Sequence, residues 1–387
     1  MPGHPARPAR KGGFDVDKLR IGIIGCGGIA GMKHFPAMIK QKHRIELVGF
    51  ADVVESRAAD AMASYGDQGA AHYTDYRKLL DDKSIDVVYV LTPNVSHSEI
   101  TVNALHAGKH VLCEKPMAPT TADAKAMLDA VKATGKKLTI GYQNRFRTDS
   151  QILHQACRAG DLGDIYFAKA HAVRRRGVPT WGVFPDKAKQ GGGPLIDLAT
   201  HALDLALWMM DNYEPAMVLG TTFEKMRDKF EGNWFGPWDP KTFEVEDSAF
   251  GFVKMKNGAT IFIEAAWALN VARSREGQVT LCGTEAGAEL VGEGAAAPNS
   301  SIHSGEVIFN QMKYNQQLEL APTPVSPMVK AHLGDHGPKV GDAELDAWLD
   351  AIVNDTEPYI KPQQAFVVTQ ILDAIYKSAA EGRAIQL

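Results

Sequence analysis

The first 144 residues alternate short apolar runs with stretches of helical periodicity. The apolar runs of strand length span residues 19–25, 45–51, 71–73, 85–91, 110–113 and 137–141. Strands that alternate with helices in this way predict a parallel, doubly wound sheet. Ligands bind such sheets beyond the carboxyl ends of the strands, so the residues that follow each run are the first candidates for a functional site.

Beyond residue 145 the pattern changes to longer runs in which polar and apolar positions alternate. These runs span 165–173, 217–223, 249–255, 259–266, 278–282 and 307–309. Asn257-Gly258, between two of them, is typical of a tight hairpin. Two helical stretches, 342–354 and 362–380, end the chain. We expect an α/β protein with a disordered tail at 1–17, a Rossmann domain with a doubly wound parallel sheet at 18–144, and an α+β domain with an open, largely antiparallel sheet at 145–387.

One helical stretch, GGGPLIDLATHALDLALW at 191–208, is apolar almost all round and carries its polar groups on one stripe. Pro194 suits the first turn, which does not need its N–H. Asp197, His201, Asp204 and Trp208 follow at steps of four, three and four, which places them on one face. Such a helix is buried, and its polar groups need partners. Asp197 and His201 in this stripe could form a structural pair in the core, a catalytic pair, or part of a metal site. Nothing nearby resembles a zinc cluster, so we expect no metal.

The first apolar run leads directly into GCGGIA, residues 25–30, and then into a helix. This is the G-x-G-x-x-A form of the dinucleotide-binding motif: Gly25 makes the tight turn, Gly27 lets the pyrophosphate approach and Ala30 allows helix packing. We expect the cofactor loop to comprise Gly25, Gly27, Gly28, Ile29 and Ala30. The alternative is a tight turn that holds no ligand.

Asp52 follows the second apolar run, about one crossover after the glycines. A carboxylate there accepts hydrogen bonds from the adenosine ribose hydroxyls and repels a 2′-phosphate, which favours NAD over NADP as the cofactor. Arg57 is near enough in sequence to meet a 2′-phosphate, so NADP stays open. Asp52 would have a structural role instead if it only capped the next helix.

Polar residues also follow the later apolar runs. After the fourth and fifth runs, the residues expected to contact the cofactor are Thr92, Pro93, Asn94, His97, Glu114 and Lys115. Asn144 and Arg145 follow the sixth run. Lys115 follows a buried strand directly and precedes a proline, which places it at the nicotinamide half of the cleft, whereas a lone lysine is usually a solvated charge. Asn94 and His97 would contact the nicotinamide ribose, or serve as caps and turns.

Arg174 and Trp181 lie in a loop rich in glycine and proline, after the first run of the second domain. The arginine would hold a phosphate or carboxylate and the tryptophan would stack on a sugar ring. The alternative is a solvated basic loop. The segment 229–242 is similarly aromatic and irregular, and we interpret it as a lid or a subunit contact.

The composition narrows the classes of partner. A chain of 387 residues with 45% hydrophobic and 23% charged residues is an ordinary globular protein of two domains. Its net charge of −4 favours small molecules over nucleic acid or anionic membranes. Four cysteines without a CxxC pair indicate neither disulfides nor a zinc ribbon, which fits the cytoplasm. No apolar run reaches the roughly 20 residues of a membrane span, and the start lacks the core of a secretory signal.

The chain resembles the Gfo/Idh/MocA family, the group of glucose-fructose oxidoreductase and inositol dehydrogenase. The resemblance rests on motifs spread over nearly the whole chain: GCGGIA, AD at 51–52, TPN with His97, AGKHVLCEKP, NRF, and GGGPLIDLATHALD. It implies a Rossmann domain and an open-sheet substrate domain, in homodimers or homotetramers. It also implies that Lys115, Asp197 and His201 form the catalytic group. His201 would take the hydroxyl proton, Lys115 would stabilise the reacting oxygen, and Asp197 would orient His201 or bind a neighbouring hydroxyl.

The resemblance further implies a pyranose sugar, a sugar derivative or a cyclitol as substrate. Inositol dehydrogenases often carry an acid two positions before the three glycines, where this chain has Lys189, so inositol is less favoured. The residues expected to line the substrate site are Asn144, Arg145, Arg174, Trp181, Asp197 and His201. We expect an NAD-dependent dehydrogenase of a secondary hydroxyl. Two alternatives stay open: a redox-neutral glycoside hydrolase or lyase that oxidises its sugar transiently, and a non-catalytic nucleotide-binding sensor.

Overall fold

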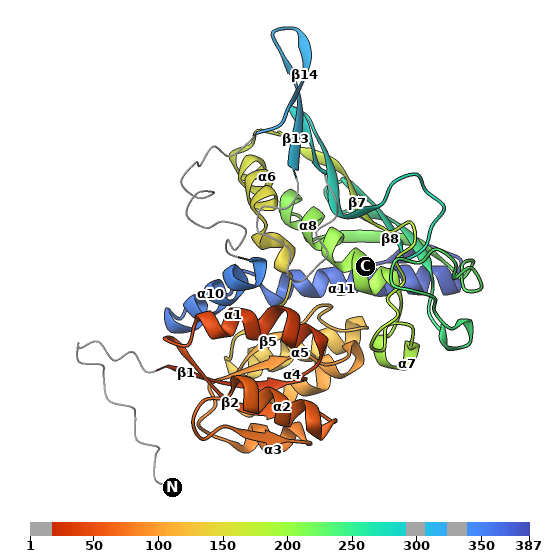
Figure 1. Cartoon of the computed structure of the whole chain (residues 1–387). Coiled ribbons are helices and arrows are strands. Elements are labelled where there is room, and N and C mark those ends of the chain that lie inside the picture. The colour runs from red at the N-terminus through yellow and green to blue at the C-terminus, as the bar shows by residue number, and fades with distance from the viewer. Residues whose placement is uncertain (1–17, 292–305, 323–338) are drawn as a thin grey trace.

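The computed structural model describes residues 18–291, 306–322 and 339–387, so the predicted tail lies outside the described residues. Two sheets form the frame of the molecule, and the long helix α11 (Pro362–Glu381) crosses between them (Figure 1). We call them the Rossmann sheet and the open sheet.

The Rossmann sheet has six parallel strands in the order β3-β2-β1-β4-β5-β6. Their bounds are β1 Leu19–Ile24, β2 Ile45–Ala51, β3 Ala71–Tyr73, β4 Val87–Val90, β5 His110–Cys113 and β6 Leu138–Ile140. The helices between them are α1 Phe35–Lys40, α2 Glu55–Tyr65, α3 Tyr76–Asp81, α4 His97–His106 and α5 Thr121–Thr134. The central strands are apolar and buried because helices cover both faces. This strand order is that of the dinucleotide-binding fold, which confirms the predicted doubly wound sheet.

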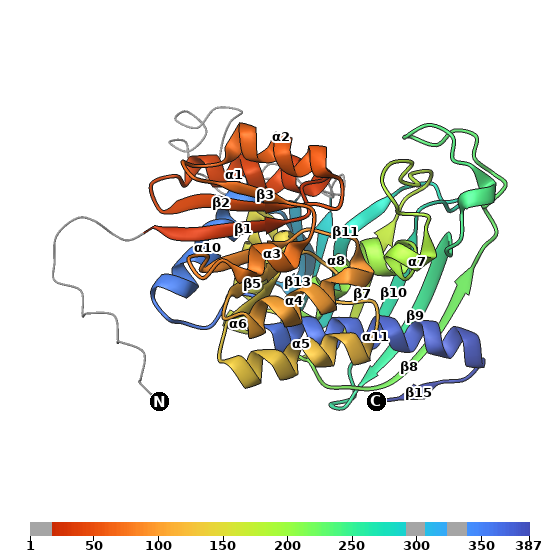
Figure 2. The ribbon, with the colours of Figure 1, turned by 90° about the horizontal axis from the view of Figure 1, so that it is seen from below.

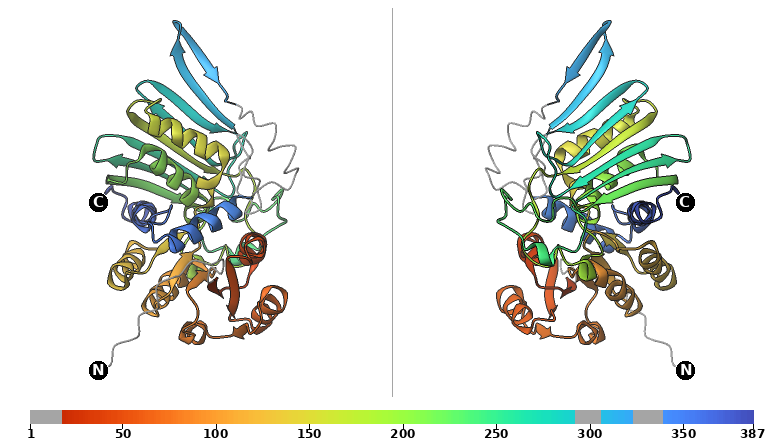
Figure 3. Two further views of the ribbon diagram at one scale, coloured as in Figure 1. Left: turned by 90° about the vertical axis from the view of Figure 1, so that its left-hand side faces the viewer. Right: turned by 90° about the vertical axis from the view of Figure 1, so that its right-hand side faces the viewer.

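The open sheet has nine strands in the order β14-β13-β12-β11-β7-β10-β9-β8-β15. Their bounds are β7 Ile165–Val173, β8 Pro215–Phe223, β9 Ser248–Met255, β10 Thr260–Ala266, β11 Arg275–Gly283, β12 Ala286–Val291, β13 Glu306–Lys313, β14 Gln316–Leu320 and β15 Ile385–Gln386. Only β7 and β10 pair in parallel, so the largely antiparallel sheet is confirmed. Strands β12, β14 and β15 were not predicted. The hairpin of β13 and β14 extends beyond the rest of the sheet (Figure 3).

Helices cover one face of the open sheet and join it to the Rossmann sheet. Helices α6 (Thr148–Ala159) and α8 (Thr200–Met210) lie on this face, and α8 packs on β7 and β11 (Figure 2). Helix α10 (Val340–Val353) packs on α1, whereas α11 packs on β8 and on α5. The proposed division at residue 144 therefore stays a prediction, because the last helix, α11, contacts strands of both sheets.

The predicted helix at 194–210 is made of two parts. Residues Leu195–Ala199 (η4) form a π-helical turn, and α8 continues from it. A second π-helical turn, Ala30–His34 (η1), follows the glycine motif. Single π-helical turns within helices occur frequently at functional sites, because the extra residue re-aims the side chains around it. The two π-helical turns therefore indicate a functional site in the region between the two sheets.

Candidate active site

Lys115 and Asp197 meet where β5 of the Rossmann sheet faces the η4 turn. Lys115 Nζ lies 2.9 Å from Asp197 Oδ1 and 3.0 Å from the carbonyl oxygen of the same residue. Burial alone would raise the pKa of Asp197, but the charges of Lys115 and Arg174 hold that pKa below its usual value. Asp197 is therefore ionised at neutral pH. The structure brings together two of the three residues expected to be catalytic.

The second oxygen of Asp197 is held by a residue that the sequence analysis missed. Trp267, fully buried at the end of β10, donates its indole N–H to Asp197 Oδ2 over 3.0 Å. No described residue links the Asp197 carboxylate to His201 by a hydrogen bond. The carboxylate is thus fixed by a cation on one oxygen and an indole on the other. An apolar run gives no sign of such a role, so the sequence held no usable signal for Trp267.

His201 lies in the first turn of α8, four residues after Asp197, and is 8% exposed. Burial and the positive charge of Lys115 lower its pKa to about 3. Its Nδ1 is buried without a hydrogen-bond partner in the described chain. The imidazole is therefore neutral at working pH and can accept a proton. Its ring meets Tyr142 edge-on, with the ring centres 6.3 Å apart.

Asp204 and Trp208, which shared the predicted stripe, have partners elsewhere. Arg145, fully buried, donates from Nε and Nη2 to the two oxygens of Asp204 over 2.9 and 2.6 Å. Its guanidinium carbon lies 5.3 Å from the ring centre of Trp208. The ion pair between Arg145 and Asp204 fixes the position of α8. The structural interpretation of the stripe therefore applies to Asp204 and Trp208, whereas the catalytic interpretation of Asp197 and His201 stays a prediction.

Two of the three glycines before the helix, Gly192 and Gly193, make room for the buried carboxylate of Glu246 and its partner Tyr376. Its oxygens accept hydrogen bonds from the N–H groups of Gly193 (2.9 Å) and Leu195 (3.2 Å) and from the hydroxyl of Tyr376 (2.8 Å). A Cβ on Gly193 would lie 2.3 Å from the Glu246 carbonyl oxygen, and one on Gly192 would lie 2.0 Å from the Tyr376 hydroxyl. Glu246 therefore satisfies free N–H groups at the start of the helix that carries Asp197 and His201. The sequence analysis did not identify Glu246 or Tyr376.

A buried charge cluster lies directly behind Lys115. Lys33 Nζ is 2.7 Å from Glu114 Oε1 and 2.8 Å from Glu344 Oε2, and His34 Nε2 is 2.8 Å from the same Glu114 oxygen. The other Glu114 oxygen accepts the backbone N–H of Lys115 over 3.1 Å. The cluster thus joins the η1 turn, the end of β5 and α10 behind Lys115. Glu114 was expected to contact the cofactor, and the structure places it 5% exposed among these partners.

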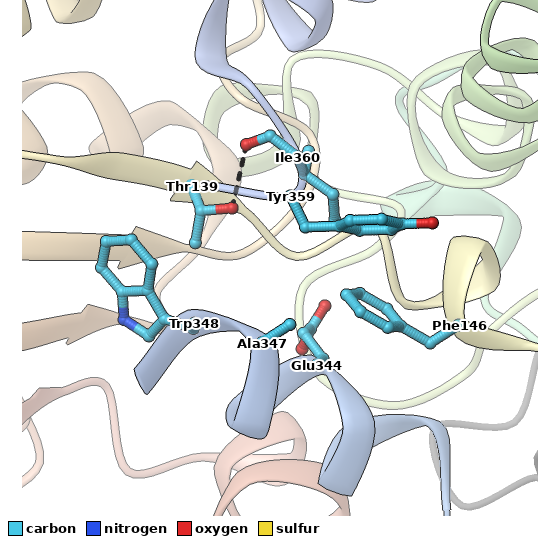
Figure 4. Close-up of a pocket in the computed structure, with 7 residues that line it drawn as sticks. All are labelled: Thr139, Phe146, Glu344, Ala347, Trp348, Tyr359 and Ile360. Atoms are coloured by element: carbon cyan, nitrogen blue, oxygen red, sulfur yellow. Dashed lines mark hydrogen bonds between the residues drawn. The ribbon is translucent and has the colours of Figure 1, made fainter. Parts of the chain in front are cut away.

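Glu344 also borders a small cavity with room for about one water molecule (Figure 4). Phe146, Tyr359 and Trp348 are among the side chains around it. Burial raises the pKa of Glu344 to about 7. Its Oε1 and the indole nitrogen of Trp348 have no hydrogen-bond partner among the described residues. The cavity is part of the packing behind Lys115.

The glycine loop has the shape that a dinucleotide requires. Gly25 has a φ of 97°, and a Cβ there would lie 2.5 Å from the carbonyl oxygen of Leu91. A Cβ on Gly27 would meet nothing within 4 Å, so the space beside this backbone is open. Gly28 is exposed, Ile29 is half-buried and Ala30 is fully buried against the sheet. The tight turn, the open approach and the close packing fit a pyrophosphate on this loop.

Asp52 lies beside that loop at the end of β2. Its oxygens accept hydrogen bonds from the N–H groups of Cys26 and Val54, each over 2.9 Å. The first of these ties the carboxylate to the glycine loop, and the second closes a local turn before α2. Asp52 is not the cap of that helix, because its N-cap residue is Val54. Arg57 is exposed on α2 and has no described partner. The position of Asp52 fits a ribose site.

The residues after β4 link the two halves of the molecule. Asn94 Nδ2 donates to the carbonyl oxygen of Gln190, next to the three glycines, over 3.0 Å. His97 is fully buried, with its ring nitrogens 2.7 Å and 2.9 Å from the carbonyl oxygens of Pro116 and Thr92. Thr92 is half-buried and Pro93 is exposed. His97 thus supports the peptide that follows Lys115, and its contact with a cofactor remains a prediction.

The residues expected to bind substrate occupy different environments. Asn144 is 3% exposed and Arg145 is fully buried, both beneath α8. Arg174 forms a two-pronged ion pair with Glu276, with Nε and Nη2 at 2.6 and 2.7 Å from its oxygens. Trp181, in contrast, is 47% exposed. Their contacts with a substrate remain predictions, and Trp181 is the one that is open to solvent.

The fold and the site define a two-domain oxidoreductase with a nucleotide-binding Rossmann sheet. The family model described as "Oxidoreductase family, NAD-binding Rossmann fold" matches residues 19–142, and its companion, "C-terminal alpha/beta domain", matches residues 155–387. The chain therefore belongs to the Gfo/Idh/MocA family of oxidoreductases, as its motifs indicated. The predicted NAD-binding Rossmann domain is confirmed.

Several characterised proteins are similar to this chain. The D-glucoside 3-dehydrogenase of Escherichia coli (strain K12) is 33% identical over 97% of this chain and 100% of its own length. An inositol 2-dehydrogenase of Salmonella typhimurium (strain LT2) is 29% identical over 50% of this chain and 55% of its own. The crystal structure of aldose-aldose oxidoreductase from Caulobacter crescentus, complexed with glycerol, has a TM-score of 0.76 and 25% identity over 96% of this chain and 100% of its own. That of levoglucosan dehydrogenase with NADH and levoglucosan has a TM-score of 0.77 and 22% identity over 96% of this chain and 99% of its own, which supports the fold.

Proposed function

We propose that this protein is an NAD-dependent dehydrogenase that transfers a hydride between a secondary hydroxyl of a pyranoside, or the matching ketone, and nicotinamide. The observation that carries the proposal is the contact of Lys115 with Asp197, one helical turn before a neutral His201, at the carboxyl end of β5. The D-glucoside 3-dehydrogenase of Escherichia coli, which this chain matches over its full length, supports a glucoside oxidised at C3 as the substrate. The carboxylate of Asp52 supports NAD over NADP.

The glycine loop from Gly25 to Ala30 and Asp52 would hold the cofactor, which supplies the hydride acceptor when it is bound. The substrate loses two particles: the C–H hydride, and the proton of its hydroxyl. His201 takes that proton, because its neutral imidazole is the form that accepts one. Its Nδ1 is buried, which leaves Nε2 for the substrate. Lys115 stabilises the negative charge that develops on the oxygen as the proton leaves.

Asp197 serves this reaction by positioning Lys115. The carboxylate and the carbonyl oxygen of Asp197 both accept from Lys115 Nζ, which directs the ammonium group toward the helix that carries His201. Trp267 prevents the carboxylate from turning away. Each carboxylate oxygen keeps a further lone pair, so Asp197 can also accept a bond from a neighbouring substrate hydroxyl.

We further infer that the protein acts in the cytoplasm as a homodimer or homotetramer. Large apolar side chains follow one another across three strands of the open sheet: Phe262 faces Phe252, and Phe252 faces Leu219. Phe262 and Leu219 are 44% and 47% exposed, which is typical of a surface that a partner covers. The described cysteines are free thiols, and no described helix is long and apolar enough to cross a membrane. Sedimentation velocity measures the oligomeric state directly.

The test of the catalytic proposal is NADH formation by the protein with excess NAD and a panel of glucosides, free sugars and inositols. We expect His201→Asn to lower turnover by roughly 10²- to 10⁴-fold while NADH binding, followed by fluorescence, is unchanged. His154→Asn is the matched control, because His154 stacks on Trp208 of the same helix, with ring centres 3.8 Å apart, on the side of Arg145. A fully active His201→Asn would contradict the proposal. Cleavage of a glycoside without NADH accumulation would assign the redox-neutral hydrolase or lyase reaction instead.

A further inference from the structure

A line of aromatic rings leads from the catalytic carboxylate to the surface of the protein. It starts at Trp267, which binds Asp197, and continues through Phe184 to Trp181, with ring centres 6.3 and 5.9 Å apart. Phe235 meets Trp181 at 4.7 Å and Trp234 at 6.5 Å. Each contact is edge-to-face, the arrangement that aromatic pairs prefer. The inner end of this line is part of the catalytic site.

The outer three rings are open to solvent. Trp181 is 47% exposed, Trp234 is 57% exposed and Phe235 is 41% exposed. Isolated apolar side chains are common on protein surfaces, but a group of large aromatic side chains that continues into a catalytic site is typical of a ligand-binding surface. We call Trp181, Trp234 and Phe235 the aromatic platform.

Two loops that are far apart in sequence build the platform, and hydrogen bonds connect them. Asn233 accepts the N–H of Val178 over 2.8 Å and donates to its carbonyl oxygen over 3.0 Å. Thr180 donates its hydroxyl hydrogen to the carbonyl oxygen of Phe235 over 2.6 Å, and the N–H of Trp234 donates to the carbonyl oxygen of Arg176 over 3.2 Å. The platform is therefore held in place before a ligand arrives, which lowers the entropic cost of binding.

Arg174 and Arg176, near the platform, both have hydrogen-bond partners, but within the described chain only the charge of Arg174 is paired. Arg174, whose guanidinium carbon lies 5.9 Å from the ring centre of Phe235, is neutralised by its two-pronged bond to Glu276. Arg176 donates to the side-chain oxygen of Asn270 over 2.8 Å. Arg174 is therefore a poor anchor for a phosphate or carboxylate. The aromatic platform suits a neutral ring with an apolar face.

We propose that the aromatic platform binds the second ring of a glycoside, either a sugar or an aryl aglycone, while the first ring reacts at Lys115 and His201. The proposal rests on the proposed function and specifies its substrate class. A pyranose ring presents a face of C–H groups that packs on aromatic side chains, and an aryl group stacks on them directly. The platform would therefore make the protein prefer two-ring glycosides over the free sugar or its methyl glycoside.

The experiment compares kcat/KM for methyl glucoside with kcat/KM for phenyl glucoside and cellobiose, using NAD and both anomers of the simple glucosides. We expect the wild-type protein to prefer the two-ring substrates, and Trp181→Ala or Phe235→Ala to lower that preference by roughly tenfold. Trp181→Phe keeps an aromatic face and should retain most of it. Tyr166→Ala, which removes an aromatic side chain that is 58% exposed on β7 of the open sheet, is the matched control and should leave the preference unchanged.

Equal kcat/KM for one-ring and two-ring glucosides in the active wild-type protein would overturn this inference and leave the proposed function standing. An equal loss on both substrate types in Trp181→Ala would also overturn it. A change in sedimentation coefficient in that variant would assign the platform to a contact between two copies of the chain. If the wild-type protein oxidises no glucoside, the proposed function fails. Quenching of tryptophan fluorescence by phenyl glucoside then tests the platform separately, and absence of quenching overturns it.

Discussion

Among the described residues, Lys33 is the only cation that contacts both Glu114 and Glu344, two buried carboxylates. We therefore expect Lys33→Met to lower the free energy of unfolding substantially. The Lys33 side chain is fully buried, and its Nζ lies 2.7 Å from Glu114 and 2.8 Å from Glu344. Methionine retains most of the volume, so the change isolates the charge. Without the cation, two negative groups remain close together away from water. Removing one partner of a buried ion pair typically costs about 3–5 kcal/mol.

The cost should depend on pH in a defined direction. The pKa of Glu344, raised by burial to about 7, lies above the value of about 4.5 for an exposed glutamate. The folded protein therefore binds more protons than the unfolded chain between these two values, and this contribution to stability is lost as the pH rises through 7. Loss of Lys33 raises the pKa of Glu344 further. The destabilisation by Lys33→Met should therefore be larger at about pH 8 than at about pH 6.

Urea denaturation at about pH 6 and about pH 8 measures both effects. The double variant Lys33→Met/Glu344→Gln removes one charge of each sign and should recover part of the lost stability. Lys40→Met is the matched control, because the exposed Lys40 pairs with Asp342 across the same two helices, at 2.6 Å, and such surface pairs contribute about 0–1 kcal/mol. A Lys33→Met protein within about 1 kcal/mol of wild type at both pH values would refute the reasoning. So would a double variant no more stable than the single one.

Two further predictions follow from buried polar groups. Trp267→Phe keeps a ring beside Asp197 but removes the N–H that binds Oδ2. The pKa of Asp197 should therefore rise and kcat should fall by roughly tenfold, without a change in NADH affinity. Steady-state kinetics across pH measures kcat, and a variant with wild-type kcat would contradict this prediction. Burial lowers the pKa of His201 to about 3 and those of His110 and His154 to about 4. As the pH falls below about 6.5, these three histidines become protonated in the unfolded chain before they do so in the folded protein. The free energy of unfolding therefore decreases toward pH 4, and His201 alone lowers it by about 2 kcal/mol at pH 5. Thermal unfolding at about pH 6.5 and about pH 5 tests this prediction, and a melting temperature that does not fall at the lower pH would contradict it.

The elements that local sequence determines were predicted well. Strand β7 was predicted residue for residue from its alternation of polar and apolar positions, although its last four residues are all buried. Strand β1 was predicted within one residue from its run of apolar positions. Strands β14 and β15 were not predicted. Strand β14 (QQLEL) has few apolar side chains, and β15 has two residues. Both are strands only because a neighbouring strand supplies their hydrogen bonds, and no local pattern records that.

In the candidate site, too, local sequence patterns do not reveal residues whose role depends on tertiary contacts. Asp197 and His201 stood out because they interrupt an apolar helix, and Lys115 because it directly follows a buried strand. Their catalytic role was inferred from the resemblance to the family. Their partners carry no such mark: Trp267 continues an apolar strand, and Lys33 lies in a helix whose burial depends on α10, some 300 residues later. A residue that contributes chemistry violates the local pattern, whereas a residue that holds it in place follows the local pattern and acts through tertiary contacts. Sequence reasoning therefore identifies candidates for the reacting groups and misses the residues that hold them in place, and the variants at Lys33 and Trp267 test the latter directly.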